Sequence, residues 1–343
     1  MKVLLVKMSS MGDVIHTLPA LTDLWHAMSD VQVDWVVEPA FAEIPAWHPA
    51  VKKVIPITLR HWRKNIFSKK TWRDMQTFYR TLQEKKYDMI IDAQGLLKSA
   101  IVSTTARGPS HGFNQHSARE RLAGFFYQQK YAVDINQHAV LRTRELFSKI
   151  GSYSLPNTTP DYCIHPNQLP TLSISLAKEY MVFLHGTTWE NKCYPEIYWE
   201  ALLEKIKPMT VYLPWGNAAE KSRAEKLQRK ASHAIVLPKL NIAEMATVLK
   251  NACAVVAVDT GLGHLCAALS TPTISLYGPT DPQQIGTIGN NQIHLQAHFP
   301  CAPCQRRTCH YAKSHITSVV PACYTTVTPE MIAQQLVEWY GYS

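Results

Sequence analysis

Residues 254–269 read AVVAVDTGLGHLCAAL, an uninterrupted apolar run followed directly by a glycine-containing turn and an apolar helical pattern. An apolar run without alternation is typical of a parallel strand that is covered on both faces. Asp259 and Thr260 are residue types that favour the start of a helix. The stretch therefore predicts one strand–helix unit of a doubly wound α/β sheet.

The same pattern recurs along the whole chain. Predicted strands cover 3–8, 33–38, 51–57, 88–93, 181–185, 210–214, 234–238, 254–259, 272–277 and 292–296. Predicted helices cover 17–29, 71–86, 139–150, 195–206, 217–232, 241–251 and 262–269. The segment 154–175, which begins with the four prolines of SLPNTTPDYCIHPNQLP, interrupts this alternation. We therefore expect two doubly wound domains, at 1–160 and 161–327, and a last helix within 328–343 that would pack back on the first domain.

Composition and charge narrow the class of protein. With 343 residues, of which 46% are hydrophobic, the chain is long enough for two cores and unlike a disordered protein. It has no apolar run of about 18 residues and no signal peptide at its start, so we expect a cytoplasmic protein. The segment 52–86 holds eleven Lys or Arg and two acidic residues. Its net charge is therefore +9, which equals the net charge of the whole chain. It predicts an anionic partner, although a solvated basic face is the plain alternative.

Ligands of doubly wound folds bind at the carboxyl ends of the strands, so the residues that follow each strand are the site candidates. After strand 254–259, the backbone N–H groups of Thr260 to Gly263 and the helix dipole favour a diphosphate. Gly261 and Gly263 would allow close approach, and His264 adds a possible hydrogen bond. The turn is not a dinucleotide fingerprint, because position 266 is cysteine. A plain helix cap with packing glycines is the alternative.

Two further strand ends in the second half carry suitable groups. After strand 181–185, Thr187 and Thr188 offer hydroxyls, and Lys192 offers a charge that can reach a phosphate oxygen. After strand 210–214, Glu220 could accept a hydrogen bond from a ribose hydroxyl, or simply stabilise the start of its helix.

The first half carries one carboxylate among several cations. Asp13 lies in the loop SSMGD, where we expect Gly12 to allow a sharp turn. Such a set describes an acceptor site in which cations bind an anionic substrate and the carboxylate removes a hydroxyl proton. A helix N-cap is the alternative role for Asp13. The other residues of the predicted acceptor site are Ser10, Arg60, Arg63, Lys64, Gln94 and Lys98.

Several stretches together resemble one family of enzymes. They are KMSSMGDVIHTLPALTD, VDWVVEPAFAEIPAWHP, VIPITLRHWRK, DAQGLLKSA, FLHGTTWENK, LPWG and VDTGLGHLCAAL with YGPTDP. In this order, from residue 1 to about 290, they are similar to the lipopolysaccharide heptosyltransferases of glycosyltransferase family 9. The opening loop is closer to the enzymes that add the first heptose than to those that add the second. The resemblance implies a GT-B fold, in which two Rossmann-like domains face a central cleft.

The resemblance also implies the substrates. The second half would hold the donor ADP-L-glycero-β-D-manno-heptose, and the first half would hold the Kdo region of Kdo2-lipid A. Asp13 would be the base, Lys192 would act at the diphosphate, and Arg60, Arg63 and Lys64 would meet Kdo carboxylates or lipid A phosphates. Because this acceptor is a lipid, the resemblance also implies that the enzyme associates peripherally with the anionic cytoplasmic face of the inner membrane. The donor residues would be Thr187, Thr188, Lys192, Glu220, Leu240, Asp259, Thr260, Gly261 and His264.

One segment departs from the enzymes that add the first heptose. Near the end of the chain, Cys301, Cys304, Cys309 and Cys323 have the spacing C-x2-C-x4-C-x13-C. They could hold a structural zinc ion, or they could be free thiols. For catalysis we expect no metal and no cofactor, because none of the eleven aspartates has another aspartate two residues away, as a D-x-D metal motif would require.

Two other functions compete with this prediction. A related heptosyltransferase with another core acceptor is supported by the tail cysteines. A basic nucleic-acid-binding protein is the candidate from another class, because Trp62, Trp72, Phe78 and Tyr79 lie among the cations of 52–86 and could stack on bases. No recognised nucleic-acid module accompanies them, so we expect no nucleic-acid partner.

Overall fold

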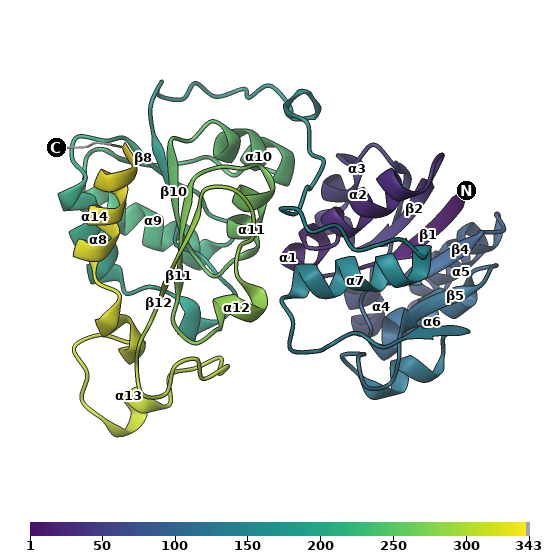
Figure 1. Cartoon of the computed structure of the whole chain (residues 1–343). Helices are drawn as coiled ribbons and strands as arrows, with labels where there is room; N and C mark the ends of the chain where they lie inside the picture. Colours follow the sequence, from purple (N-terminus) through teal and green to yellow (C-terminus); the bar gives the residue numbers. More distant parts are fainter. Residues whose placement is uncertain (341–343) are drawn as a thin grey trace. The chain divides into compact units, whose positions relative to one another are not determined.

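The computed structural model describes residues 1–340 of the chain, which divides into two compact units, Met1–His165 and Pro166–Ser343. Each unit is built on a six-stranded parallel sheet with helices packed against it (Figure 1). The predicted α/β class is confirmed. The last three residues of the predicted segment 328–343 lie outside the described residues.

The sheet of the first unit has the order β3-β2-β1-β4-β5-β6. Its strands are β1 (Lys2–Val6), β2 (Gln32–Val37), β3 (Val51–Pro56), β4 (Met89–Asp92), β5 (Ser110–Phe113) and β6 (Gln129–Tyr131). The first four were predicted. The prediction missed β5 and β6, whose sequences SHGF and QKY contain neither an apolar run nor a clear alternation. Strand β5 pairs with β4, and β6 pairs with β5, so both are defined by their partners in the sheet.

Helices of the first unit cover both faces of this sheet. They are α1 (Met11–Ile15), α2 (Leu18–Ala27), α3 (Glu43–Ala46), α4 (Leu59–Lys64), α5 (Lys69–Gln83), α6 (Leu97–Thr105) and α7 (Ala139–Gly151), with 3-10 turns η1 (Pro39–Phe41) and η2 (Arg121–Phe125). Helices α2 and α7 pack against each other. On the other face, one core joins Leu4 and Val6 of β1 to Trp62, Leu82 and Val102 of α4, α5 and α6.

A buried ion pair ties α7 to α2 and to the segment that leaves the first unit. The Arg144 guanidinium donates from Nε to Asp23 Oδ2 at 2.6 Å and from Nη2 to Asp23 Oδ1 at 3.2 Å. The same guanidinium donates to the carbonyl oxygens of Pro156 and Thr158. The Arg144 side chain is 2% exposed, so its charge depends on these acceptors.

We expect Arg144→Met to lower the free energy of unfolding by about 3–5 kcal/mol, because Asp23 would keep a buried charge without a partner. Urea unfolding followed by circular dichroism measures the change. The matched control is Lys53→Met, which breaks the exposed pair with Glu84 at 3.5 Å and should cost below about 1 kcal/mol. Equal losses in the two variants would contradict the role of the buried pair. The double variant Asp23→Leu/Arg144→Met should recover much of the loss.

The second unit repeats the architecture with the order β12-β11-β10-β7-β8-β9. Its strands are β7 (Met181–Leu184), β8 (Val211–Leu213), β9 (Ala234–Val236), β10 (Ala254–Val258), β11 (Thr273–Tyr277) and β12 (Gln292–Gln296). All six were predicted. Its helices are α8 (Glu196–Lys205), α9 (Ala218–Lys230), α10 (Ile242–Lys250), α11 (Gly261–Ala268), α12 (Pro282–Ile285), α13 (Tyr311–Ser314) and α14 (Pro329–Tyr340), with 3-10 turns η3 (Pro166–Gln168), η4 (Glu190–Lys192) and η5 (Ala322–Thr326).

The last helix, α14, packs against α8. It begins at Pro329, as predicted, and its side chains Ile332 and Leu336 are fully buried in the core of the second unit. The apolar side chains of α14 thus pack within the second unit. Packing of this helix on the first domain stays a prediction. Among residues 1–340, no helix combines the length and apolar character that a membrane span requires.

Candidate active site

The loop after β1 holds Asp13 in two roles. Helix α1 begins directly after Ser10, and Asp13 is its third residue. Asp13 Oδ2 accepts hydrogen bonds from the Ser10 N–H and the Ser10 hydroxyl, each at 2.9 Å. The expected sharp turn at Gly12 is wrong, because Gly12 lies inside α1. Ser10 is the N-cap, and one oxygen of Asp13 completes the cap while the other is left for a second partner.

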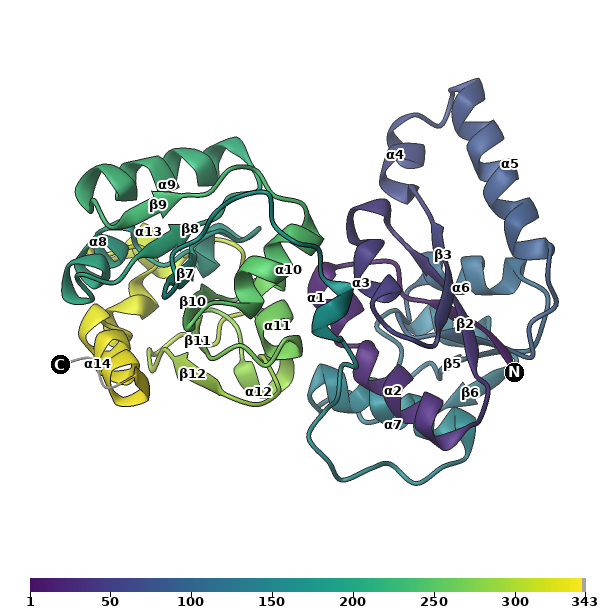
Figure 2. The same ribbon diagram turned by 90° about the horizontal axis from the view of Figure 1, so that it is seen from above.

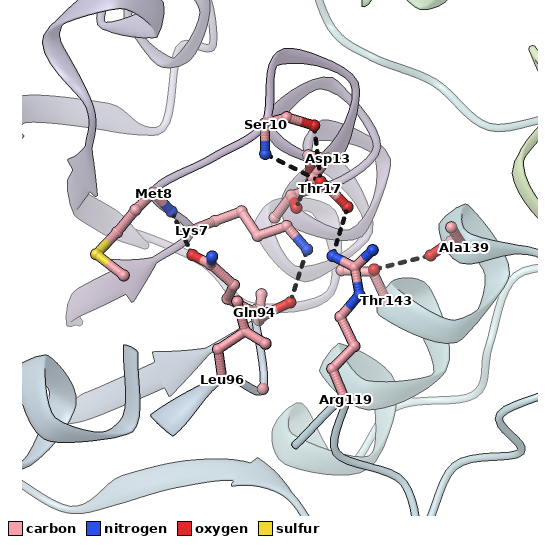
Figure 3. A network of polar contacts seen from close by, with 12 residues as sticks. Lys7, Met8, Ser10, Asp13, Thr17, Gln94, Leu96, Arg119, Ala139 and Thr143 are labelled. Atoms are coloured by element: carbon pink, nitrogen blue, oxygen red, sulfur yellow. Dashed lines mark hydrogen bonds and ion pairs between the residues drawn. The ribbon is translucent and has the colours of Figure 1, made fainter. Parts of the chain in front are cut away.

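Two cations neutralise Asp13 from outside its own helix. Arg119, in the loop after β5, points its Nη1 at Asp13 Oδ1 at 3.4 Å, and Lys7, at the end of β1, reaches the same cluster (Figure 3). The Lys7 Nζ donates to the Ala93 carbonyl at 2.9 Å and is buried. Burial alone would raise the pKa of Asp13, but the charges of Lys7 and Arg119 and the Ser10 N–H hold this pKa well below its usual range. Burial also lowers the pKa of Lys7.

The other predicted acceptor residues lie at neighbouring strand ends. Gln94, after β4, is buried, and its Oε1 accepts the Met8 N–H at 2.9 Å, so it braces the β1 loop. Lys98 is exposed on α6. On α4, Arg63 and Lys64 are exposed, and Arg60 Nε lies 3.7 Å from Glu38 Oε1. The structure thus brings Ser10, Asp13 and Gln94 together and places the α4 cations at the end of β3.

The second unit gathers its predicted donor residues at the end of β10. Lys192 Nζ lies 2.7 Å from Asp259 Oδ2, which also accepts the Thr280 hydroxyl at 2.7 Å. The Thr187 hydroxyl donates to the Asp259 carbonyl at 2.9 Å, and His264 Nε2 lies 4.0 Å from Asp259 Oδ1. A buried carboxylate therefore holds the Lys192 ammonium group near the start of α11.

Helix α11 begins at Gly261, with Thr260 as its N-cap. Of the N–H groups from Thr260 to Gly263, that of Gly263 donates to the Thr260 carbonyl at 3.0 Å and is not available to a ligand. The N–H groups of Gly261 and Leu262 precede the first helical hydrogen bonds. These two donors, the helix dipole and Lys192 are groups that can bind a phosphate.

Glu220 lies against the loop after β7. Its Oε2 accepts the Gly216 N–H at 2.7 Å, and a Cβ on Gly186 would lie 2.6 Å from the Glu220 carboxyl carbon. Only glycine at 186 allows this approach of the Glu220 carboxylate to the loop after β7. Thr188 is exposed, and Leu240 is half-buried in the loop after β9. The donor candidates thus lie along the carboxyl edge of four adjacent strands, β10, β7, β8 and β9.

The cysteine segment braces the loop that carries Lys192. Asn191 is buried, its N–H donates to the Arg307 carbonyl at 3.0 Å, and its Nδ2 donates to the Arg306 carbonyl at 3.0 Å. The Tyr324 hydroxyl donates to the Lys192 carbonyl at 2.9 Å. The loop is thereby fixed from the far end of the chain.

Zinc binding and free thiols were the two alternatives for Cys301, Cys304, Cys309 and Cys323, and the structure describes free thiols. Among the described residues, no three potential ligands are grouped so that they could hold a metal ion, and all four thiols are free. The surroundings of the individual thiols differ. Cys323 is packed in the second core, Cys304 lies 3.5 Å from Asn191 Nδ2, and Cys301 is exposed.

Three residues of the site were missed by the sequence analysis. Lys7 could have been predicted, because a lysine at the end of a buried strand needs hydrogen-bond acceptors there. Gly186 could also have been predicted, because it is a glycine at the end of a predicted strand. Arg119 lies in an irregular loop after an unpredicted strand, so nothing near it in the sequence pointed to Asp13.

Two Rossmann-like α/β domains, one with a shielded carboxylate and the other with a phosphate-type helix start, define a glycosyltransferase of the GT-B class. Comparison with known proteins narrows the class. The family model described as Glycosyltransferase family 9 (heptosyltransferase) matches residues 75–315. The chain therefore belongs to glycosyltransferase family 9, and it is a lipopolysaccharide heptosyltransferase.

Individual relatives agree over nearly the whole chain. Lipopolysaccharide heptosyltransferase 1 of Pseudomonas aeruginosa is 49% identical over 98% of this chain and 97% of its own length. The protein of the same name from Escherichia coli K12 is 48% identical over 87% of this chain and 94% of its own. The solved structure of E. coli heptosyltransferase WaaC with ADP superposes with a TM-score of 0.86 at 44% identity, and covers 99% of this chain and 100% of that one.

Proposed function

We propose that the protein transfers L-glycero-D-manno-heptose from ADP-L-glycero-β-D-manno-heptose to the Kdo region of Kdo2-lipid A, with inversion at the anomeric carbon. The observation that carries the proposal is the division of chemistry between the units. Asp13 is held as an anion beside Arg119 in the first unit, and Lys192 stands at an anion-binding helix start in the second. The solved complexes of E. coli WaaC, with ADP and with ADP-2-deoxy-2-fluoro heptose, support the nature of the donor.

When the donor binds, Lys192 would exchange its ion pair with Asp259 for an ion pair with the diphosphate. A diphosphate oxygen is a stronger partner for an ammonium than a carboxylate that already accepts the Thr280 hydroxyl. The N–H groups of Gly261 and Leu262 would bind the same diphosphate, and His264 would donate to it. Thr187 and Thr188 would offer hydroxyls next to these groups. Further along the strand edge, Glu220 would accept from the ribose and Leu240 would contact the adenine.

In the acceptor site, Arg119 would turn from Asp13 to a carboxylate of Kdo. The Asp13 carboxylate would then lose a cation that lowers its pKa and become a better base. It removes the proton of a Kdo hydroxyl as that oxygen attacks the anomeric carbon of heptose. The bond from this carbon to the diphosphate oxygen breaks on the opposite face, and ADP leaves with the electron pair. Lys192 and the α11 N–H groups stabilise the charge that builds on the leaving diphosphate. Ser10, Arg60, Arg63, Lys64, Gln94 and Lys98 would complete the acceptor site.

A lipid acceptor places the reaction at a membrane surface. We propose that the protein acts at the cytoplasmic face of the inner membrane, bound peripherally. The basic segment 52–86 supports this, since each basic residue near an anionic bilayer contributes about 1 kcal/mol.

The proposed function is tested by turnover with ADP-heptose and two acceptors, Kdo2-lipid A and the same lipid that already carries one heptose. We expect ADP release and a mass increase of one heptose with the first acceptor only. An α-configured product from the β-configured donor, seen by NMR, would show inversion. Preference for the heptosylated acceptor would replace this proposal by the related enzyme with another core acceptor. No transfer to either acceptor would refute it.

A further inference from the structure

We propose that the hairpin of α4 and α5, residues 59–83, is a membrane-inserting tip that places apolar side chains below the headgroups of an anionic bilayer. The inference rests on the proposed lipid acceptor. It goes beyond a general electrostatic attraction, because it assigns a defined part of the fold and an apolar contribution that salt does not screen.

The turn between the two helices exposes the most apolar surface of the hairpin. Phe67 is 99% exposed and its neighbour Ile66 is 49% exposed. The turn is ordered, because the Asn65 N–H donates to the His61 carbonyl at 3.1 Å and the Ser68 N–H to the Asn65 carbonyl at 3.0 Å. An ordered turn that points two large apolar side chains into water suits a site that an apolar medium covers.

Helix α5 continues this surface along one face. Trp72 and Tyr79 are 58% and 50% exposed, and they are seven residues apart, which is two helical turns. The opposite face of α5 packs into the core that joins β1 to α4, α5 and α6, through Met75, Phe78 and Leu82. The outer aromatics are therefore free for another partner, and tryptophan and tyrosine are the residues that favour the membrane interface. The outward face of α5 consists of Lys69, Trp72, Arg73, Gln76, Tyr79 and Arg80.

Cations surround this apolar tip, so the surface that covers it should be anionic. Within the described chain, one of them lies in an ion pair, Arg60 with Glu38 at 3.7 Å, and no ion pair joins the others to an acid. Figure 2 shows the hairpin extending outward from the sheet of the first unit, with the turn at its far end. Apolar side chains at the tip and cations around them are the pattern of a segment that lies in an anionic interface. The cations are Arg60, Arg63, Lys64, Lys69, Lys70 and Arg73.

Flotation of the full chain with vesicles tests the proposal. The vesicles contain three parts phosphatidylethanolamine and one part phosphatidylglycerol, and vesicles of phosphatidylcholine serve as the neutral comparison. Phe67→Ser removes the apolar group without a change in charge, and we expect vesicle partitioning to fall roughly 10-fold or more. The matched control is Ile197→Ser, since Ile197 is 57% exposed on α8 of the second unit, and its partitioning should stay unchanged.

Activity separates this inference from the proposed function. Phe67→Ser should lose turnover on Kdo2-lipid A embedded in vesicles but keep it on a deacylated, water-soluble acceptor. If both variants float as the unaltered protein does, the inserting tip is refuted while the heptosyltransferase stands. Binding of single-stranded oligonucleotide that Phe67→Ser abolishes, without vesicle binding, would instead assign the hairpin to nucleic acid. Thermal unfolding of both variants checks that the exposed substitutions leave the fold intact.

Discussion

Asp13→Asn lowers turnover roughly 10²–10⁴-fold, with the fold and donor binding retained, if Asp13 is the base. The substitution keeps the shape of the side chain, and the Asn carbonyl oxygen can still accept the Ser10 N–H that now lies 2.9 Å from Asp13 Oδ2. What is lost is the ability to take up a proton. Steady-state kinetics at saturating donor measure the effect, and thermal unfolding confirms the fold.

The control for Asp13→Asn is Ser10→Ala. It removes the Ser10 hydroxyl bond to the carboxylate but leaves the base, so its effect on turnover should be small beside that of Asp13→Asn. Near-normal turnover of Asp13→Asn would end the assignment of Asp13 as base.

The pH dependence gives a second readout for the same residue. Lys7 and Arg119 lower the pKa of Asp13 in the folded protein, so the carboxylate stays ionised as the pH falls through the usual range of aspartate. The stability that this pairing contributes is present above the unfolded pKa and is lost as the pH falls through the folded pKa. In the free enzyme, the acid limb of kcat/KM should lie below the usual range, and Arg119→Gln should move it to higher pH.

Lys192→Ala should lower kcat/KM for ADP-heptose by roughly 10²–10³-fold and change the KM for the acceptor little. In the proposed mechanism Lys192 meets the leaving diphosphate, and it lies beside the helix start that would bind the same group. The matched control is Lys221→Ala, an exposed lysine on α9 whose loss should leave donor kinetics unchanged.

A loss of activity in Lys192→Ala must be separated from a loss of stability. The substitution leaves Asp259, which is 5% exposed, without its cation. The double variant Lys192→Met/Asp259→Asn removes both charges, so it should regain stability but not donor use. An unchanged KM for the donor and an unchanged kcat in Lys192→Ala would contradict the role of the lysine.

The fold was predictable wherever local pattern and tertiary context agree. Strands such as β10 are continuous apolar runs because they are covered on both faces, and that burial is written in the sequence itself. Strands β5 and β6 carry no such pattern, since SHGF and QKY are accepted as strands only because β4 offers its edge. Helix α6 was missed for a similar reason, as its β-branched and polar residues give a weak helical signal.

The site was predictable where a functional side chain lies on a turn that follows a strand. Asp13, Lys192 and Asp259 were predicted as site residues in this way, because strand ends can be located in the sequence. Arg119 was out of reach, since it meets Asp13 from 106 positions away, through a loop after an unpredicted strand. The cysteine spacing left zinc binding and free thiols open, because spacing alone does not show that Cys323 packs in the core while Cys301 faces water.

The sequence by itself determined the two doubly wound domains, the family of the chain, and the loops that carry the carboxylate and the donor-binding groups. It could do so because apolar burial and loop chemistry are local properties of the chain. Only the tertiary structure decided the cations that lower the pKa of Asp13, the ion pair of Lys192 with Asp259 and the free thiols of the last segment. Each of these depends on distances between atoms that are far apart in sequence, and Coulomb energies and hydrogen bonds exist only once those distances are set.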